Sequence, residues 1–290
     1  MKQKDGTFQG AGGMELTYQS WFPDEAPRAV VMIAHGIGEH MGRYGNVVNA
    51  FVPQGYAVAG FDQRGHGRSP GQRGHINRWA DYREDMRAFF QMVQKQNPTG
   101  PVFLYGHSMG ALIALDYILH YPEGLRGAVI SGAPIEPIGV AKPGLVAVAR
   151  VMFGIWPTFA VKLGLDHAAL DRDPAVVKAY DEDPLVHGMV SARWGTESLA
   201  TVAWVKEHCA EISIPTLFVH GEADRLNSAD GACHFVEKIH FGDKGVYIDP
   251  GSYHEPHNDL NHEQVLQEIE AWMQRHLVEA VPHAEARQAS

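Results

Sequence analysis

The sequence predicts an α/β fold in which a mostly parallel central sheet is flanked by helices on both faces. Short apolar runs alternate with longer amphipathic or apolar stretches along most of the chain, which is typical of parallel strands joined by helices. The alternation breaks between Pro134 and about Ser191, a gap far longer than ordinary connections. The 290 residues suffice for one large domain with an insertion, or for two small domains.

The predicted elements follow one another in a regular order. Residues 14–22 alternate like a half-exposed strand, and we expect residues 6–9 to pair with them across a glycine turn. Further strands are predicted at 29–36, 56–62, 102–105, 126–134, 214–224 and 244–254, and helices at 44–55, 76–96, 109–119 and 259–277. The inner stripe of the last helix is formed by Val265, Ile269, Trp272 and Met273.

These elements divide the chain into four parts. We expect residues 1–135 and 191–277 to form the core, residues 136–190 to form a helical insertion, and residues 278–290 to form a flexible tail. The stretch 142–165 is apolar and helix-like. A membrane span is not expected there, because Pro143 and Pro157 interrupt it and it carries the cations Lys142, Arg150 and Lys162.

The insertion has two interpretations. It either packs on the core as extra helical structure, or forms a lid that covers a site and touches lipid surfaces. The lid is favoured, because long insertions in compact domains are often functional.

Composition restricts the function. Apolar residues make up 45% and charged residues 20%, a globular balance. The formal net charge of −10 argues against nucleic acid as a partner. We expect no metal and no cofactor, because neither the two cysteines nor the 17 histidines show a metal-ligand spacing. The first residues lack the apolar region of a secretory signal, so we expect a cytoplasmic protein, with peripheral membrane contact if the lid touches lipid. Nothing in the sequence indicates an oligomeric state.

A serine stands where the strand at 102–105 gives way to an apolar helix. Ser108 lies between Gly106 and Gly110 in a Gly-x-Ser-x-Gly pattern. At a strand-to-helix joint this pattern is typical of a nucleophile elbow, a strained turn that exposes the serine hydroxyl. The alternative is that Ser108 only caps the helix. The strand before it and the helix after it favour the nucleophile.

A serine nucleophile needs a base and an acid that orients the base. In folds of this kind they follow the serine in the order acid, then histidine, in loops after late strands. Asp224 comes just past one predicted strand and His254 just past the next, so both emerge at the sheet edge where Ser108 stands. Glu222 and His257 are the alternatives for the acid and the base.

Six stretches carry a resemblance to a known family: HGIGEHMGRY, FDQRGHGRSPGQRG, YGHSMGA, AYDEDPL, HGEADRL and GSYHEPH. Together they resemble the monoacylglycerol lipase branch of the α/β-hydrolases, a branch grouped with lysophospholipases and serine aminopeptidases. The resemblance implies Ser108 as nucleophile, Asp224 as acid and His254 as base. One departure is Ala111, where the family usually has a second glycine, and this small change puts little in doubt.

The resemblance also implies an oxyanion hole made by the backbone N–H groups of Ile37 and Met109. Met109 is the first residue of the predicted helix, so its N–H is free to meet a developing negative charge. Residues near the alcohol headgroup would be Glu39, Arg43, His107, Tyr180 and His257. For Glu39 and Arg43 an ion pair that braces the loop is an equal alternative, and Tyr180 could instead pack within the lid.

The activity implied is hydrolysis of a small-molecule acyl ester, with monoacylglycerol cleaved to fatty acid and glycerol. A general carboxylesterase and a lysophospholipase are the alternatives, and no residue indicates the amino-terminal binding site of a peptidase. A non-catalytic scaffold is a different class of function. We expect such a protein to lack one of the three residues Ser108, Asp224 and His254 or the glycines that flank the serine, and none is missing here.

Overall fold

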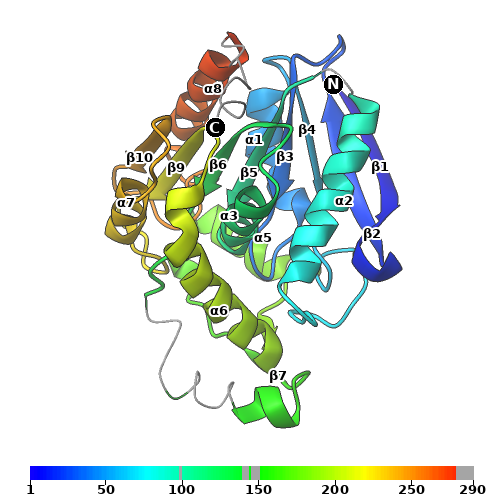
Figure 1. Cartoon of the computed structure of the whole chain (residues 1–290), viewed down its shortest axis with the longest axis vertical. Coiled ribbons are helices and arrows are strands. Elements are labelled where there is room, and N and C mark those ends of the chain that lie inside the picture. Colours follow the sequence, from blue (N-terminus) through cyan, green and yellow to red (C-terminus); the bar gives the residue numbers. More distant parts are fainter. Residues whose placement is uncertain (98–99, 139–143, 145–150, 279–290) are drawn as a thin grey trace, which may run out of the picture.

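The computed structural model describes residues 1–97, 100–138, 144 and 151–278. Its centre is an eight-stranded sheet in the order β1-β2-β4-β3-β5-β6-β9-β10 (Figure 1). β2 pairs antiparallel with both β1 and β4, and the other neighbours pair parallel. The strands are β1 Lys2–Gln9, β2 Glu15–Phe22, β3 Ala29–Ala34, β4 Tyr56–Phe61, β5 Val102–His107, β6 Leu125–Ser131, β9 Thr216–Gly221 and β10 Lys244–Asp249.

Helices cover both faces of this sheet. They are α1 Gly45–Phe51, α2 Ala80–Gln96, α3 Met109–His120, α6 Ala192–His208, α7 Ala229–Glu237 and α8 His262–Val278. Successive side chains of β3 enter different cores: Val30 and Met32 pack in the core that contains α2 and α3, whereas Val31 and Ile33 pack with α1 and α8. A strand buried on both faces reads as a continuous apolar run, which is why these strands were predictable.

The predicted α/β class and most of the predicted elements are confirmed. The four residues that mark the inner stripe of α8 are all buried. β1 begins earlier than predicted and pairs with β2 over its whole length. The sequence pattern did not single out α6 or α7. Most of the predicted tail, residues 279–290, lies outside the described residues.

The segment from 136 to 190, here called the inserted segment, lies between β6 and α6. Its described residues contain a helical turn at 151–155, β7 Ala160–Lys162, a 3₁₀ turn at His167–Ala169, α5 Pro174–Glu182 and the start of β8 Met189–Ser191. β7 and β8 form a separate antiparallel pair. Of the predicted helix-like stretch, residues 142–143 and 145–150 lie outside the described part, and the rest is only partly helical. No helix among the described residues is long and apolar enough to cross a membrane.

The end of the inserted segment, together with Ser191 directly after it, is fixed to two loops of the core. The N–H of His187 donates to the carbonyl of Gly38 at 2.8 Å, and the N–H of Ser191 donates to that of Gly74 at 2.9 Å. Both glycines have positive φ, and a Cβ on either would clash with a carbonyl oxygen of the inserted segment. This close approach and the left-handed backbone explain why both positions are glycine.

Candidate active site

Ser108 occupies a strained turn at the carboxyl end of β5. Its φ of 53° and ψ of −118° make it the one non-glycine residue with positive φ in the described chain. The turn is tightly packed, because a Cβ on Gly110 would clash with the carbonyl oxygen of Ala34. The N–H of Ser108 donates to the carbonyl of Ser131 on β6 at 2.9 Å. The glycines that flank the serine are therefore required by close backbone approach.

The structure brings Ser108, His254 and Asp224 into one chain of hydrogen bonds. Nε2 of His254 lies 2.9 Å from Ser108 Oγ, and its Nδ1 lies 2.8 Å from Asp224 Oδ2. Asp224 follows β9 and His254 follows β10, both at the sheet edge where β5 ends. Glu222, the alternative acid, is exposed and instead accepts the N–H of Gly251 at 2.9 Å.

The Asp224 carboxylate is held by donors on both oxygens. Oδ1 accepts the N–H groups of Leu226 at 2.7 Å and Asn227 at 3.1 Å. Nε2 of His220 lies 3.0 Å from Oδ2 and 3.1 Å from the carbonyl of Asn227. Since both neighbours are acceptors, this nitrogen carries a proton. Sequence reasoning missed His220 and Asn227; the only signal was a histidine four residues before Asp224.

Electrostatics favours ionised Asp224 beside a basic His254. Burial alone would raise the pKa of Asp224, but His254 and His220 hold that pKa well below its usual range. Burial alone would lower the pKa of His254, and the Asp224 carboxylate outweighs it and raises that pKa above its ordinary value. The arrangement thus stabilises the imidazolium that forms when His254 takes a proton.

Two backbone N–H groups beside Ser108 have no acceptor among the described residues. They belong to Ile37 and Met109, and both residues line the pocket that contains Ser108. The loop around Ile37 is fixed: Gly36 N–H donates to Glu39 Oε1 at 2.6 Å, and His35 Nδ1–H donates to the Gly36 carbonyl at 2.8 Å. A free N–H on a fixed loop can meet developing negative charge without reorganisation.

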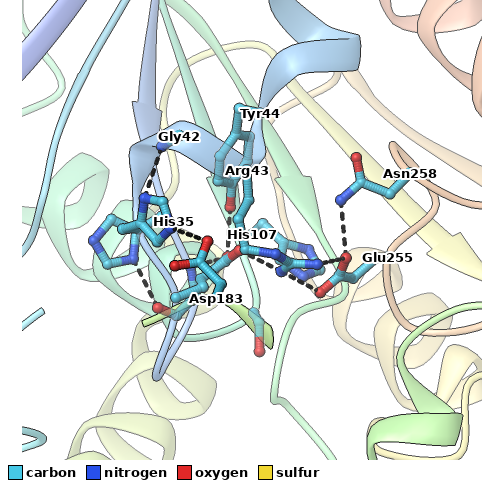
Figure 2. Close-up of polar contacts among 12 residues, drawn as sticks. His35, Gly42, Arg43, Tyr44, His107, Asp183, Glu255 and Asn258 are labelled. Atoms are coloured by element: carbon cyan, nitrogen blue, oxygen red, sulfur yellow. Dashed lines mark hydrogen bonds and ion pairs between the residues drawn. The ribbon is translucent and has the colours of Figure 1, made fainter. Parts of the chain in front are cut away.

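A buried ionic cluster lies next to this loop. Arg43 contacts Glu39 at 2.8 Å and binds both oxygens of Glu255 at 2.7 Å (Figure 2). Asn258 donates to Glu255 at 2.9 Å, and the ring of Tyr180 lies 4.7 Å from the Arg43 guanidinium carbon. Burial alone would raise the pKa of Glu255, but the facing guanidinium outweighs it and lowers that pKa to about 2. Two carboxylates thus share one cation. Sequence reasoning missed Glu255, although it adjoins His254.

The two remaining predicted histidines differ in position. His107 lines the pocket, with its ring centre 4.9 Å from that of His254. His257 does not line it. Its ring is fully buried, stacks on Tyr44 at 4.9 Å and meets the ring of His107 at 4.7 Å. Burial lowers the pKa of His257 to about 4, so this ring is neutral near pH 7. No group of three or more possible metal ligands occurs among the residues that the structure describes.

The pocket around Ser108 has mainly apolar walls. One side of the pocket is polar. It holds the ionic cluster and the hydrogen bonds from Ser108 to Asp224, and its lining includes Glu39, Arg43, His254 and Glu255. The apolar lining comes from the core, the inserted segment and α6, and includes Trp79, Leu112, Met152, Phe159, Val161, Leu163, Leu170, Trp194, Leu199 and Val202. An apolar cavity with a few convergent polar groups suits a small ligand that has an apolar chain.

The sheet, the strained serine after β5 and its two partners define the chain as an α/β-hydrolase. It matches the family described as serine aminopeptidase, S33, over residues 25–261. It is 37% identical to a monoacylglycerol lipase of Mycolicibacterium smegmatis over 93% of this chain and 97% of that one. It is 31% identical to a monoglyceride lipase of Rattus norvegicus, over 93% and 90%. The structure of a monoacylglycerol lipase of Paleococcus ferrophilus matches with a TM-score of 0.82 at 31% identity, over 91% of this chain and all of that one. The chain therefore belongs to this family of serine ester hydrolases.

Proposed function

We propose that the protein hydrolyses monoacylglycerols to fatty acid and glycerol, with Ser108 as nucleophile, His254 as base and Asp224 as the acid that orients it. The observation that carries this proposal is the hydrogen-bonded chain from Ser108 to Asp224 beside an apolar pocket. Relatives named monoacylglycerol lipase, aligned over almost the whole chain, support the choice of substrate.

In the first step Ser108 Oγ attacks the ester carbonyl carbon while His254 Nε2 takes the hydroxyl proton. The carbonyl oxygen becomes negatively charged and accepts hydrogen bonds from the N–H groups of Ile37 and Met109. Losing one such donor commonly lowers the rate about 10²–10³-fold. His254 then gives its proton to the glycerol oxygen as the ester C–O bond breaks, which leaves the acyl group on Ser108.

In the second step a water molecule attacks the acyl-enzyme. His254 takes a proton from that water, the charge again forms on the carbonyl oxygen, and the proton returns to Ser108 Oγ as the fatty acid leaves. Asp224 accepts a hydrogen bond from the Nδ1–H of His254 throughout and stays ionised, which keeps Nε2 free to act as base.

The polar residues beside Ser108 have two roles in this proposal. Glu39 already accepts from Gly36, Arg43 and Tyr44, so we assign Glu39 and Arg43 to bracing the oxyanion loop. His107 and Tyr180 line the pocket, and we assign them to the glycerol hydroxyls. His257 lies outside the pocket lining, and we assign it to positioning the ring of His107, against which it packs.

The same cluster disfavours a lysophospholipid. Arg43 is shared by Glu39 and Glu255, so the buried group carries a net negative charge. A phosphate beside it would face repulsion from the excess carboxylate. A general carboxylesterase remains the second candidate, because an apolar wall accepts any acyl chain.

We further propose that the protein is a cytoplasmic enzyme whose inserted segment is a lid between the core parts 1–135 and 191–277, with peripheral contact to lipid. Eight large apolar residues of the described chain are exposed, and five of them lie in this segment: Ile138, Val151, Ile155, Trp156 and Val161. The same segment supplies Met152 and Phe159 to the pocket wall. An apolar surface next to the pocket suits contact with aggregated lipid.

Fatty-acid release from a 1-monoacylglycerol, lysophosphatidylcholine and a short p-nitrophenyl ester tests the substrate. We expect a strong preference for the monoacylglycerol that Ser108→Ala abolishes. Hydrolysis of the short ester alone would support a general esterase. Release that persists in Ser108→Ala would exclude this serine as the nucleophile.

A further inference from the structure

Helix α6 contains a glycine that neither its backbone nor its packing requires. Gly195 lies inside the helix without positive φ, and a Cβ there would meet no atom within 4 Å. Glycine inside a helix is destabilising relative to alanine. The contrast is with Gly231 in α7, where a Cβ would come within 2.8 Å of the Glu136 side chain. The fold therefore gives no reason for Gly195.

Gly195 lies on the face of α6 that lines the pocket of Ser108, so a side chain at this position would point into that pocket. Gly195 lines that pocket together with Ser198, Leu199 and Val202, a spacing that puts all four on one face of α6. The Ser198 hydroxyl donates to the Gly195 carbonyl at 3.0 Å. Since this hydroxyl has its partner within the helix, the face needs no polar ligand and suits an apolar one.

The space at Gly195 has fixed walls. Ser191, the N-cap of α6, is tied to the core: its N–H donates to the carbonyl of Gly74 at 2.9 Å, and Nδ1 of His75 lies 2.9 Å from its Oγ. Glu197 accepts the N–H of Trp79 at 2.8 Å. Trp79 and Leu112 are themselves buried and line the same pocket. Figure 1 shows α6 running from its start near β7 toward α3. Because these bonds tie the start of α6 to the core, we expect a larger side chain at position 195 to extend into the pocket rather than to displace the helix.

We propose that Gly195 determines which acyl chains the enzyme accepts: the space beside it admits the distal methylenes of a long, unbranched acyl group, and a side chain there would exclude them. This inference rests on the proposed ester hydrolysis at Ser108 and specifies the length of the acyl chain that the enzyme prefers. Each methylene buried in an apolar site contributes about fourfold to binding, so a leucine that displaces two to three methylenes would weaken long-chain substrates about 15- to 60-fold.

The test compares Gly195→Leu with Ala200→Leu, which adds the same bulk to an exposed position of α6 outside the pocket. We would measure kcat/KM for 1-monoacylglycerols with acyl chains from about four to about sixteen carbons. For Gly195→Leu we expect the ratio of long-chain to short-chain kcat/KM to fall on the order of 10–100-fold. For Ala200→Leu we expect the wild-type ratio. An unchanged ratio in Gly195→Leu would overturn the inference.

Two further measurements separate this inference from the proposed function. Gly195→Ala adds one carbon and favours the helix, so it covers the case in which Gly195→Leu does not fold; we expect it to lower the same ratio about fourfold. Thermal stabilisation by a long-chain free fatty acid requires no catalysis. We expect it in the wild type and much less in Gly195→Leu. Stabilisation without ester hydrolysis would refute the proposed function alone, whereas equal stabilisation of both proteins would refute the role of Gly195.

Discussion

At the scale of single residues, the site depends on one strained backbone position. A non-glycine residue in the left-handed region costs on the order of 1–3 kcal/mol, and it persists only where its surroundings enforce it. Ser108 meets this condition, because β5, the carbonyl of Ser131 and the close packing of Gly110 fix its backbone. This backbone conformation places the Ser108 hydroxyl 2.9 Å from Nε2 of His254, so the strained turn positions the atom that we propose as the nucleophile.

Asp224→Asn tests the orienting role of the carboxylate. An asparagine amide can leave His254 in the wrong tautomer, so we expect turnover to fall by as much as ~10⁴-fold with little change in the fold. Measuring kcat on the preferred ester would show this. The matched control is Glu222→Gln, since Glu222 is exposed and contacts Gly251 rather than His254. Near-wild-type turnover in Asp224→Asn, with a large loss in Glu222→Gln, would reverse the assignment.

At the scale of elements, a feature could be predicted where it depends on contacts between residues that are close in sequence or on the regular pairing of parallel strands. Buried strands such as β3 and β5 read as continuous apolar runs, and an apolar helix after Ser108 left no polar face. The short strands β7 and β8 were not predictable, because three residues are too few to separate strand from helix periodicity. Parallel pairing also predicted that Asp224 and His254 would approach Ser108, because loops that follow parallel strands meet at one sheet edge.

Other parts of the site had no local signal. Glu255 and Arg43 are 212 residues apart, and only the folded chain shows that they form one ion pair. His220 is four residues from Asp224, yet its role follows from a second acceptor, the Asn227 carbonyl, on the same nitrogen. Such residues are recognised by their partners, and partners that are remote in sequence leave no pattern.

The helical turn at 151–155 is expected to contact lipid through its exposed apolar side chains. Ile155 is 76% exposed in the inserted segment. If this surface enters lipid, Ile155→Asp removes about 1.5–3 kcal/mol of apolar burial and weakens vesicle binding more than tenfold. We expect lower activity on monoacylglycerol in vesicles and unchanged activity on a soluble short ester.

Leu260→Asp is the matched control, because Leu260 is 62% exposed in the loop before α8. Co-sedimentation with neutral phosphatidylcholine vesicles gives a readout that needs no catalysis. Equal vesicle binding by the wild type and Ile155→Asp would show that this surface does not contact lipid.

At the scale of the whole molecule, the site and the fold share buried histidines. Burial lowers the pKa of six histidines in the described chain: His35, His66, His75, His107, His187 and His257. His66 contacts the rings of both His35 and His187, so this set joins the loop that carries Ile37 to the inserted segment. These rings are neutral in the folded protein, and protonating them favours the unfolded chain.

This sets the direction of the pH dependence of stability. An unfolded histidine binds a proton near pH 6.5, whereas folded His187 and His257 do so only at about pH 4. Between these values the unfolded chain binds more protons, so the stability present above pH 6.5 is lost as the pH falls toward 4. His254 opposes the trend: its pKa is raised, so its contribution is present below pH 6.5 and is lost as the pH rises.

Asp85, Asp116 and Asp171 oppose the trend in the same direction as His254, because burial raises the pKa of each carboxyl and the folded chain then binds more protons. Because the six histidines outnumber these four groups, we expect the free energy of unfolding to decrease on acidification from pH 7 to 5. Each contributes up to about 1.4 kcal/mol per pH unit, which urea titrations at several pH values would measure. His66→Gln removes one such group and is expected to make the slope shallower by up to that amount. His240→Gln, at an exposed position, is expected to leave the slope unchanged. A stability that stays constant over this range would mean that acid does not act through these buried rings, and a slope equally altered in both variants would mean that burial is not the cause.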